Sequence, residues 1–138
     1  MEPNEVAAAV LKIIELERGV FDMQAWFEKL DEDGSMLPAT VEPGQSLCGT
    51  TVCAAGGAAY VAGWTLRYDS GGATIEDRHG NKKYTTVWAE KDGARKLIHE
   101  VGTEALGLAP YETFFYEDDE TAVNELKRIA GAAYTGDL

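Results

Sequence analysis

The segment that decides the fold is 48–64, which reads CGTTVCAAGGAAYVAGW. It has no charged side chain, and its alanines and glycines let neighbouring backbones approach closely. Hydroxyl and thiol side chains near its start are suited to begin a helix, and Gly63 is suited to end it. A helix that is apolar on every side is normally buried. The sequence therefore predicts a small-residue helix over about 50–62 at the centre of the fold.

Helical periodicity appears on both sides of this segment. Apolar residues recur at helical spacing after Asn4 and again after Asp22, and both of these residues are good N-caps. Towards the C-terminus, Asp92 is suited to cap a further helix, and Asp118 or Asp119 is suited to begin the last one. Together with the central helix, these patterns predict about five to six helices.

Alternation of apolar and polar residues follows the central segment. It runs through about 64–87 and is interrupted at the pair Gly71-Gly72 and at the turn residues 77–81. We therefore expect a three-stranded antiparallel meander over about 64–87. The predicted fold is a single α+β domain, 1–138, which is mainly helical and has its helices packed around the small-residue helix.

The chain carries a net charge of −12 from 24 acidic and 12 basic residues. Surfaces that bind nucleic-acid phosphates need clustered lysine and arginine, so no direct nucleic-acid binding is expected. The longest apolar run, 52–64, is shorter than the ~20 residues that cross a bilayer. The first residues are acidic, whereas a secretory signal begins with positive charge. We expect a cytoplasmic protein that makes no membrane contact.

Cys48 and Cys53 are the two thiols of the chain. A thiol at a helix N-terminus can have a lowered pKa, so either cysteine, paired with His79 or His99, would suit a cysteine hydrolase. Buried packing is the more common role of cysteine. The four residues lack the short paired spacings of zinc motifs, and no glycine pair follows the order of a nucleotide-binding loop. No metal, no cofactor and no catalytic residue is therefore assigned.

An aromatic and acidic stretch near the C-terminus is the best candidate for a protein-binding surface. Aromatic side chains anchor interfaces, and acidic neighbours steer a basic partner. Phe114 and Phe115 are expected in the core. The candidate contact residues are Tyr111, Tyr116, Glu117, Asp118, Asp119 and Glu120. A homodimer is also compatible with the sequence, because small-residue helices pack between subunits as well as within them.

Three groups of residues carry a resemblance to a known family. They are Phe21-Asp22-Met23 with Trp26, Cys48-Gly49-Thr50 with Cys53 and Ala55-Gly56, and Ala105-Leu106-Gly107-Leu108 with Phe114-Phe115. In this combination the chain resembles a family of small uncharacterised proteins of actinobacteria and their bacteriophages. The resemblance implies an actinobacterial or phage origin, and it supplies no activity and no catalytic residue.

The function expected from these observations is that of a phage or actinobacterial accessory protein, a non-catalytic module that binds a host protein in the host cytoplasm. Two alternatives stay open. One is a cysteine hydrolase that uses Cys48 or Cys53. The other is an acidic protein that imitates the phosphate array of DNA and thereby counters a host defence protein.

Overall fold

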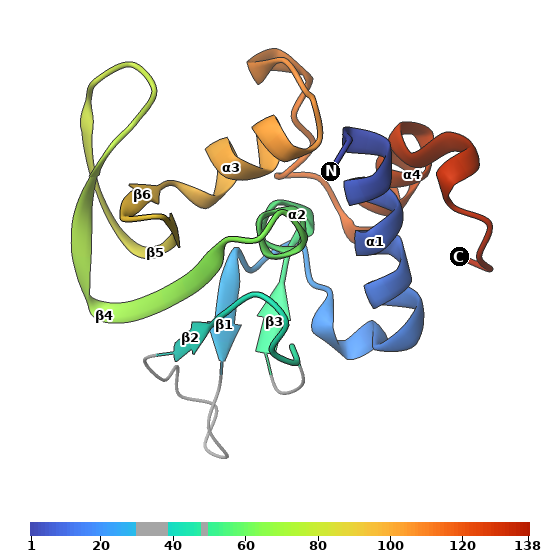
Figure 1. Ribbon diagram of the computed structural model, residues 1–138, viewed down its shortest axis with the longest axis horizontal. Helices are drawn as coiled ribbons and strands as arrows, with labels where there is room; N and C mark the ends of the chain where they lie inside the picture. Colours follow the sequence, from blue (N-terminus) through green and yellow to red (C-terminus); the bar gives the residue numbers. More distant parts are fainter. Residues whose placement is uncertain (30–38, 48–49) are drawn as a thin grey trace.

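The computed structural model describes residues 1–29, 39–47 and 50–138 (Figure 1). Within these residues the chain forms an α+β fold with four α-helices and six strands in two antiparallel sheets. The helices are α1 (Pro3–Leu16), α2 (Ala54–Val61), α3 (Ile98–Ala105) and α4 (Asp119–Ala130). The strands are β1 (Phe27–Lys29), β2 (Ala39–Val41), β3 (Thr50–Val52), β4 (Thr65–Glu76), β5 (Lys82–Lys91) and β6 (Ala94–Lys96). Short 3-10 helices are η1 (Arg18–Val20), η2 (Pro110–Glu112) and η3 (Gly131–Ala133).

The larger sheet has the strand order β2-β4-β5-β6, and β1 pairs with β3 in a separate two-stranded sheet. β4 and β5 form a long hairpin, in which Leu66 lies opposite Ala89 and both side chains are fully buried in the main core. Figure 1 shows α2 between this hairpin and the helix pair α1–α4. Because successive side chains of a strand point to opposite faces, Arg67 lies on the face of the sheet that is turned away from this core.

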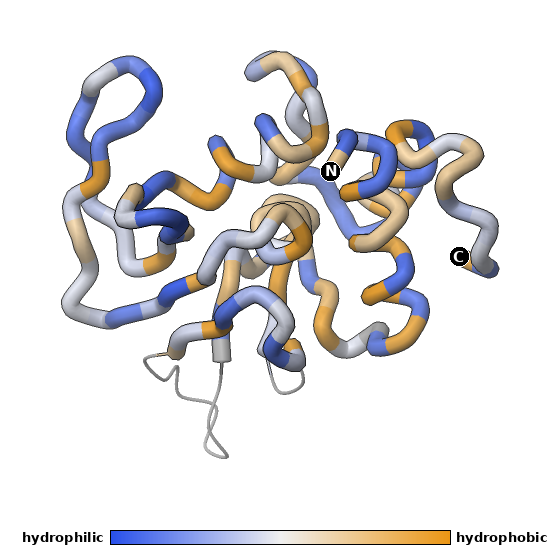
Figure 2. The backbone as a smooth tube through the Cα atoms, viewed as in Figure 1, coloured by the Kyte–Doolittle hydropathy of each residue, from blue (hydrophilic) through white to orange (hydrophobic). Residues whose placement is uncertain are grey.

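α2 lies at the centre of the structure, as the small-residue pattern predicts, and its first six residues are buried. A Cβ atom at Gly102 of α3 would lie 2.8 Å from Ala55, and one at Gly57 would lie 3.3 Å from Val10 of α1. Glycine therefore lets α1 and α3 approach α2 closely. Figure 2 shows the apolar α2 at the centre and strongly hydrophilic residues at the tip of the β4–β5 hairpin. None of the described helices is both long and apolar enough to cross a membrane.

The prediction of a mainly helical chain with five to six helices is wrong. The segment expected to form the second helix turns and then becomes β1, because pairing with β3 places Phe27 opposite Val52 and buries both side chains. This tertiary pairing overrides a local helical spacing. The central helix is also shorter than predicted, since its expected first turn is β3 and Cys53 is the N-cap of α2.

The three-stranded meander predicted over 64–87 is also wrong. β4 runs through Gly71 and Gly72 as one strand with a β-bulge in this stretch, whereas a strand end was expected there. Glycine permits such a bulge without ending the strand. The meander segment is therefore two long strands, which belong to a four-stranded sheet.

The helix expected from Asp92 begins later than predicted. Asp92 and Gly93 have φ values of 52° and 83° and connect β5 to β6 in a tight hairpin, so Asp92 caps no helix. An Asp-Gly pair readily adopts the positive φ angles that a two-residue hairpin turn requires. α3 accordingly starts only at Ile98, after the short strand β6.

Candidate functional site

A hollow of about 830 Å³ lies between two segments that are far apart in the sequence. One side is formed by Asp22, Met23, Gln24 and Trp26, and the other by 115–120, which lead into α4. We call this hollow the acidic groove. It joins the turn before β1 to the aromatic and acidic stretch near the C-terminus.

Three hydrogen bonds hold the first side of the groove in place. The amide of Met23 donates to Oδ1 of Asp119 at 2.8 Å, which ties this side to the start of α4. The amide of Asp22 donates to the carbonyl of Val52 in β3 at 3.0 Å. The amide of Ala54, the first residue of α2, donates to Sδ of Met23 at 3.3 Å. The groove is therefore built on the same small sheet and central helix that organise the core.

The small-residue helix also sets the position of Trp26. Gly56 lies so close to the carbonyl oxygen of Trp26 that a Cβ atom at this glycine would overlap it. Any other residue at this position would push the Trp26 backbone outward and would change the wall of the groove. The helix that decides the fold thus also shapes the candidate site.

Trp26 is the centre of an aromatic cluster. Its ring centroid lies 6.3 Å from that of Phe115 and 5.6 Å from that of Tyr116, both in edge-on geometry, and 6.0 Å from that of His99. Phe115 is 2% exposed, whereas Tyr116 is 84% exposed. Burial lowers the pKa of His99 and so favours its neutral ring beside the indole. The groove therefore has an apolar floor and an open aromatic rim.

Five carboxylates line the groove, and its described lining contains no lysine or arginine. They belong to Asp22, Glu117, Asp118, Asp119 and Glu120. Asp118 caps α4 by accepting a hydrogen bond from the amide of Thr121 at 2.8 Å, and this bond lowers the pKa of Asp118. The side chains of Glu117 and Glu120 have no partner among the described residues, so they are the carboxylates free to meet a ligand.

The structure brings five of the six predicted contact residues into the groove, namely Tyr116 and the acidic run 117–120. Tyr111 lies apart, 88% exposed in η2 and outside the described lining. Phe114 and Phe115 are buried, which confirms their predicted place in the core. The opposite side of the groove, with Trp26, was not predicted, because its residues fit a helical spacing. The run Phe21-Asp22-Met23 with Trp26, which carries part of the family resemblance, was the available signal.

The structure describes one of the two predicted thiols, Cys53. Cys53 is free and buried at the start of α2, and burial raises its pKa to about 11 in spite of nearby backbone amides that lower it. A thiol with this pKa is protonated at neutral pH and is a poor nucleophile. Cys48 lies outside the described residues. His79 and His99 both line a separate hollow of about 310 Å³, whose described lining does not include Cys53.

Histidine, aspartate and glutamate side chains, which can bind metals, occur along much of the part of the chain that the structure describes. No group of three or more His, Cys, Asp or Glu residues is arranged there to hold a metal ion.

Comparison with known proteins gives no family for this chain. No protein-family model, no curated protein and no solved structure matches it. The resemblance to actinobacterial and phage proteins therefore stays a prediction, and function is argued from the geometry of the site.

Proposed function

We propose that this chain is a phage or actinobacterial accessory protein that binds a host protein without catalysis, and that the acidic groove receives a basic segment of that partner. The observation that carries the proposal is the combination of an aromatic rim with five carboxylates in a hollow whose described lining has no cation. An aromatic surface alone would suit many ligands, but the carboxylates select a positively charged one.

An arginine or lysine side chain suits both parts of this groove. A cation is attracted to the faces of tryptophan and tyrosine rings, here Trp26 and Tyr116. Glu117 and Glu120 can then accept charge-assisted hydrogen bonds from it. The indole N–H of Trp26 has no acceptor among the described residues, so it is available to a carbonyl group of a bound peptide.

The overall charge supports the same proposal. A net charge of −12 attracts a basic partner over a distance and raises the rate of association at low ionic strength. Contacts inside the groove then fix the position of the partner. The hydrolase alternative receives no support from Cys53, whose buried and protonated thiol does not reach the groove.

Titration calorimetry with a hexa-arginine peptide tests the proposal. We expect saturable binding at one site, and we expect the double variant Glu117→Gln/Glu120→Gln to weaken it by about tenfold, because two charge-assisted contacts are lost. Asp118 and Asp119 are left unchanged, because their carboxylates hold α4 and Met23 in place.

A matched control removes the same charge elsewhere. Glu17→Gln/Glu42→Gln changes two exposed carboxylates outside the described lining of the groove. It should leave the affinity within about twofold of the wild type, since neither carboxylate lines the groove and exposed charges that do not touch the ligand are screened by salt. Equal losses in both double variants would show that the peptide responds to net charge alone, and the proposal would then be rejected.

A further inference from the structure

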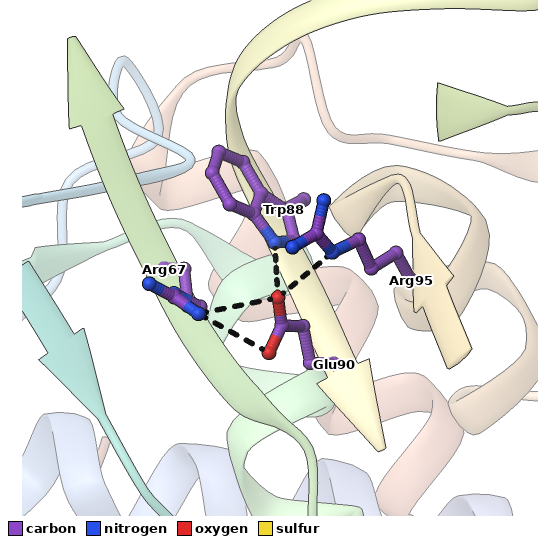
Figure 3. A network of polar contacts seen from close by, with 4 residues as sticks. All are labelled: Arg67, Trp88, Glu90 and Arg95. Carbon is purple, nitrogen blue, oxygen red and sulfur yellow. Dashed lines mark hydrogen bonds and ion pairs between the residues drawn. The ribbon is translucent and has the colours of Figure 1, made fainter. Parts of the chain in front are cut away.

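A second cluster of charged and aromatic residues lies on the face of the larger sheet that is turned away from the main core. Arg67 of β4 is the register partner of Trp88 in β5, and Glu90 of β5 is the partner of Arg95 in β6. The residues thus come from three adjacent strands. Figure 3 shows both arginines reaching from the flanking strands towards the carboxylate of Glu90. We call these four residues the arginine cluster.

Glu90 is the centre of the arginine cluster. Its Oε1 atom accepts hydrogen bonds from Nε1 of Trp88 at 2.8 Å and from Nε of Arg95 at 3.1 Å, and Nη1 of Arg67 lies 3.5 Å away. The two guanidinium groups lie 5.7 and 5.6 Å from the centroid of the Trp88 ring, within the range of cation–π attraction. Trp88 is 3% exposed. Both arginines are therefore oriented by the same carboxylate and the same ring before any ligand arrives.

The arginine cluster has an excess of positive charge in an acidic protein. The hydrogen bond from Trp88, aided by the two arginines, lowers the pKa of Glu90, so the cluster holds two cations and one anion at neutral pH. The arginine side chains are 38% and 53% exposed, and their remaining N–H groups have no acceptor among the described residues. Seven of the 12 basic residues lie in 64–97, so this part of the chain differs in charge from the rest.

The geometry points to a second binding site, in which Arg67 and Arg95 together receive a carboxylate from an acidic segment of a partner protein. Guanidinium groups bind carboxylates through two parallel hydrogen bonds, and here two such groups are already oriented. One added carboxylate balances the charge of the cluster. A doubly charged phosphate would exceed that balance and would be repelled by Glu90 more strongly than a carboxylate is.

This inference does not depend on the acidic groove, because the two sites share no residue and prefer ligands of opposite charge. The competing interpretation is that the arginine cluster is only a cross-strand brace, in which the arginines cover Trp88 and join three strands. The two interpretations differ in what an acidic peptide does to the indole N–H of Trp88.

A titration of ¹⁵N-labelled protein with a hexaglutamate peptide, followed by NMR, separates the interpretations. The indole N–H of Trp88 donates to Glu90, so its signal reports any ligand that approaches the arginine pair. We expect this signal to shift and to saturate, and we expect the indole signal of Trp26 to stay in place; Trp64 lies beneath Lys91 and Lys96 and so does not serve as a reference. Hexaglutamine, which is neutral, should leave all three signals unchanged.

Two variants and one control complete the test. Arg95→Lys keeps the charge but loses the planar fork, so the affinity should fall by about fivefold or more. Arg67→Ala/Arg95→Ala should abolish the shift. Lys82→Ala, which removes an exposed cation from the same sheet, should stay within about twofold of the wild type. If the double variant does not fold, Arg95→Lys still decides the question. No Trp88 shift in the wild type, or an equal loss in Lys82→Ala and Arg95→Lys, would overturn the inference.

Discussion

Two tryptophans of this protein sit in opposite electrostatic surroundings. Trp26 lies beside aromatic rings and carboxylates at an open groove, whereas Trp88 is covered by two arginines and donates its N–H to Glu90. The hydrogen-bonding capacity of Trp88 is used within the protein, and that of Trp26 is not used by any described residue. The difference shows that an indole at one site serves packing while an indole at the other is available to a ligand.

The largest expected effect is the loss of stability when Trp88 is replaced, because this tryptophan is assigned to packing. Trp88→Ala should lower the free energy of unfolding by about 3 to 5 kcal/mol, because a buried ring and its hydrogen bond are lost together. Trp26→Ala should cost only about 1 to 2 kcal/mol, since this ring is half-buried, but it should abolish binding of hexa-arginine. Urea denaturation measures the first quantity and calorimetry the second. Equal losses of stability would contradict the assignment of Trp88 to packing and Trp26 to binding.

A substitution in α2 should damage the Trp26 side of the molecule selectively. Gly56→Ala places a Cβ atom on the carbonyl oxygen of Trp26 and should cost about 2 to 3 kcal/mol. Gly19→Ala is the matched control, because no atom lies within 4 Å of the added carbon, and it should stay within about 0.5 kcal/mol of the wild type. Thermal melting and the indole NMR signals provide the measurement. An unchanged Trp26 signal in a folded Gly56→Ala protein would contradict the proposed contact.

Burial in the core should protect the thiol of Cys53 from alkylation. In a Cys48→Ser background, iodoacetamide should modify Cys53 at least about a hundredfold more slowly in the native protein than in urea, because burial raises the pKa of this thiol to about 11. Mass spectrometry over time measures the two rates. Rapid modification of the native protein would place Cys53 at an accessible site and would revive the hydrolase alternative.

The smallest expected effect is the pH dependence of stability that comes from His99, which lies beside Trp26. Burial lowers the pKa of His99, so the unfolded chain binds a proton more readily than the folded one. Stability should therefore be complete above about pH 6.5 and should decrease as the pH falls through the lower pKa of the folded state. Denaturation between about pH 7.5 and 5.5 should show this slope in the wild type and in His79→Gln, and a flatter profile in His99→Gln. If the slope of stability against pH persists in His99→Gln, then another group causes it, and the assignment to His99 is wrong.

Part of this architecture was readable from the sequence. The absence of charge in 48–64 predicted a buried small-residue helix, and α2 is that helix. The acidic and aromatic stretch near the C-terminus predicted five residues that line the groove. Both predictions depend on local composition, which a single segment carries by itself.

The remaining features depend on contacts between distant segments. The spacing around Phe27 is helical, but pairing with β3 makes this segment a strand, and no local pattern reveals that partner. Asp92 was predicted to cap a helix, but pairing of β5 with β6 makes Asp92 and Gly93 the turn of a tight hairpin. The side of the groove at Trp26 was missed for a similar reason, since Gly56 and Asp119 position it from elsewhere in the chain, and the run Phe21-Asp22-Met23 with Trp26 marked the segment without revealing these contacts.

The most direct test of the account is the indole N–H spectrum of ¹⁵N-labelled protein titrated with hexa-arginine, with the three signals assigned by Trp→Phe variants. The account predicts that the Trp26 signal shifts and saturates while the Trp88 signal stays in place. A shift confined to Trp88, equal shifts at all three tryptophans, or no shift would contradict the claim that the acidic groove is the binding site for a basic segment.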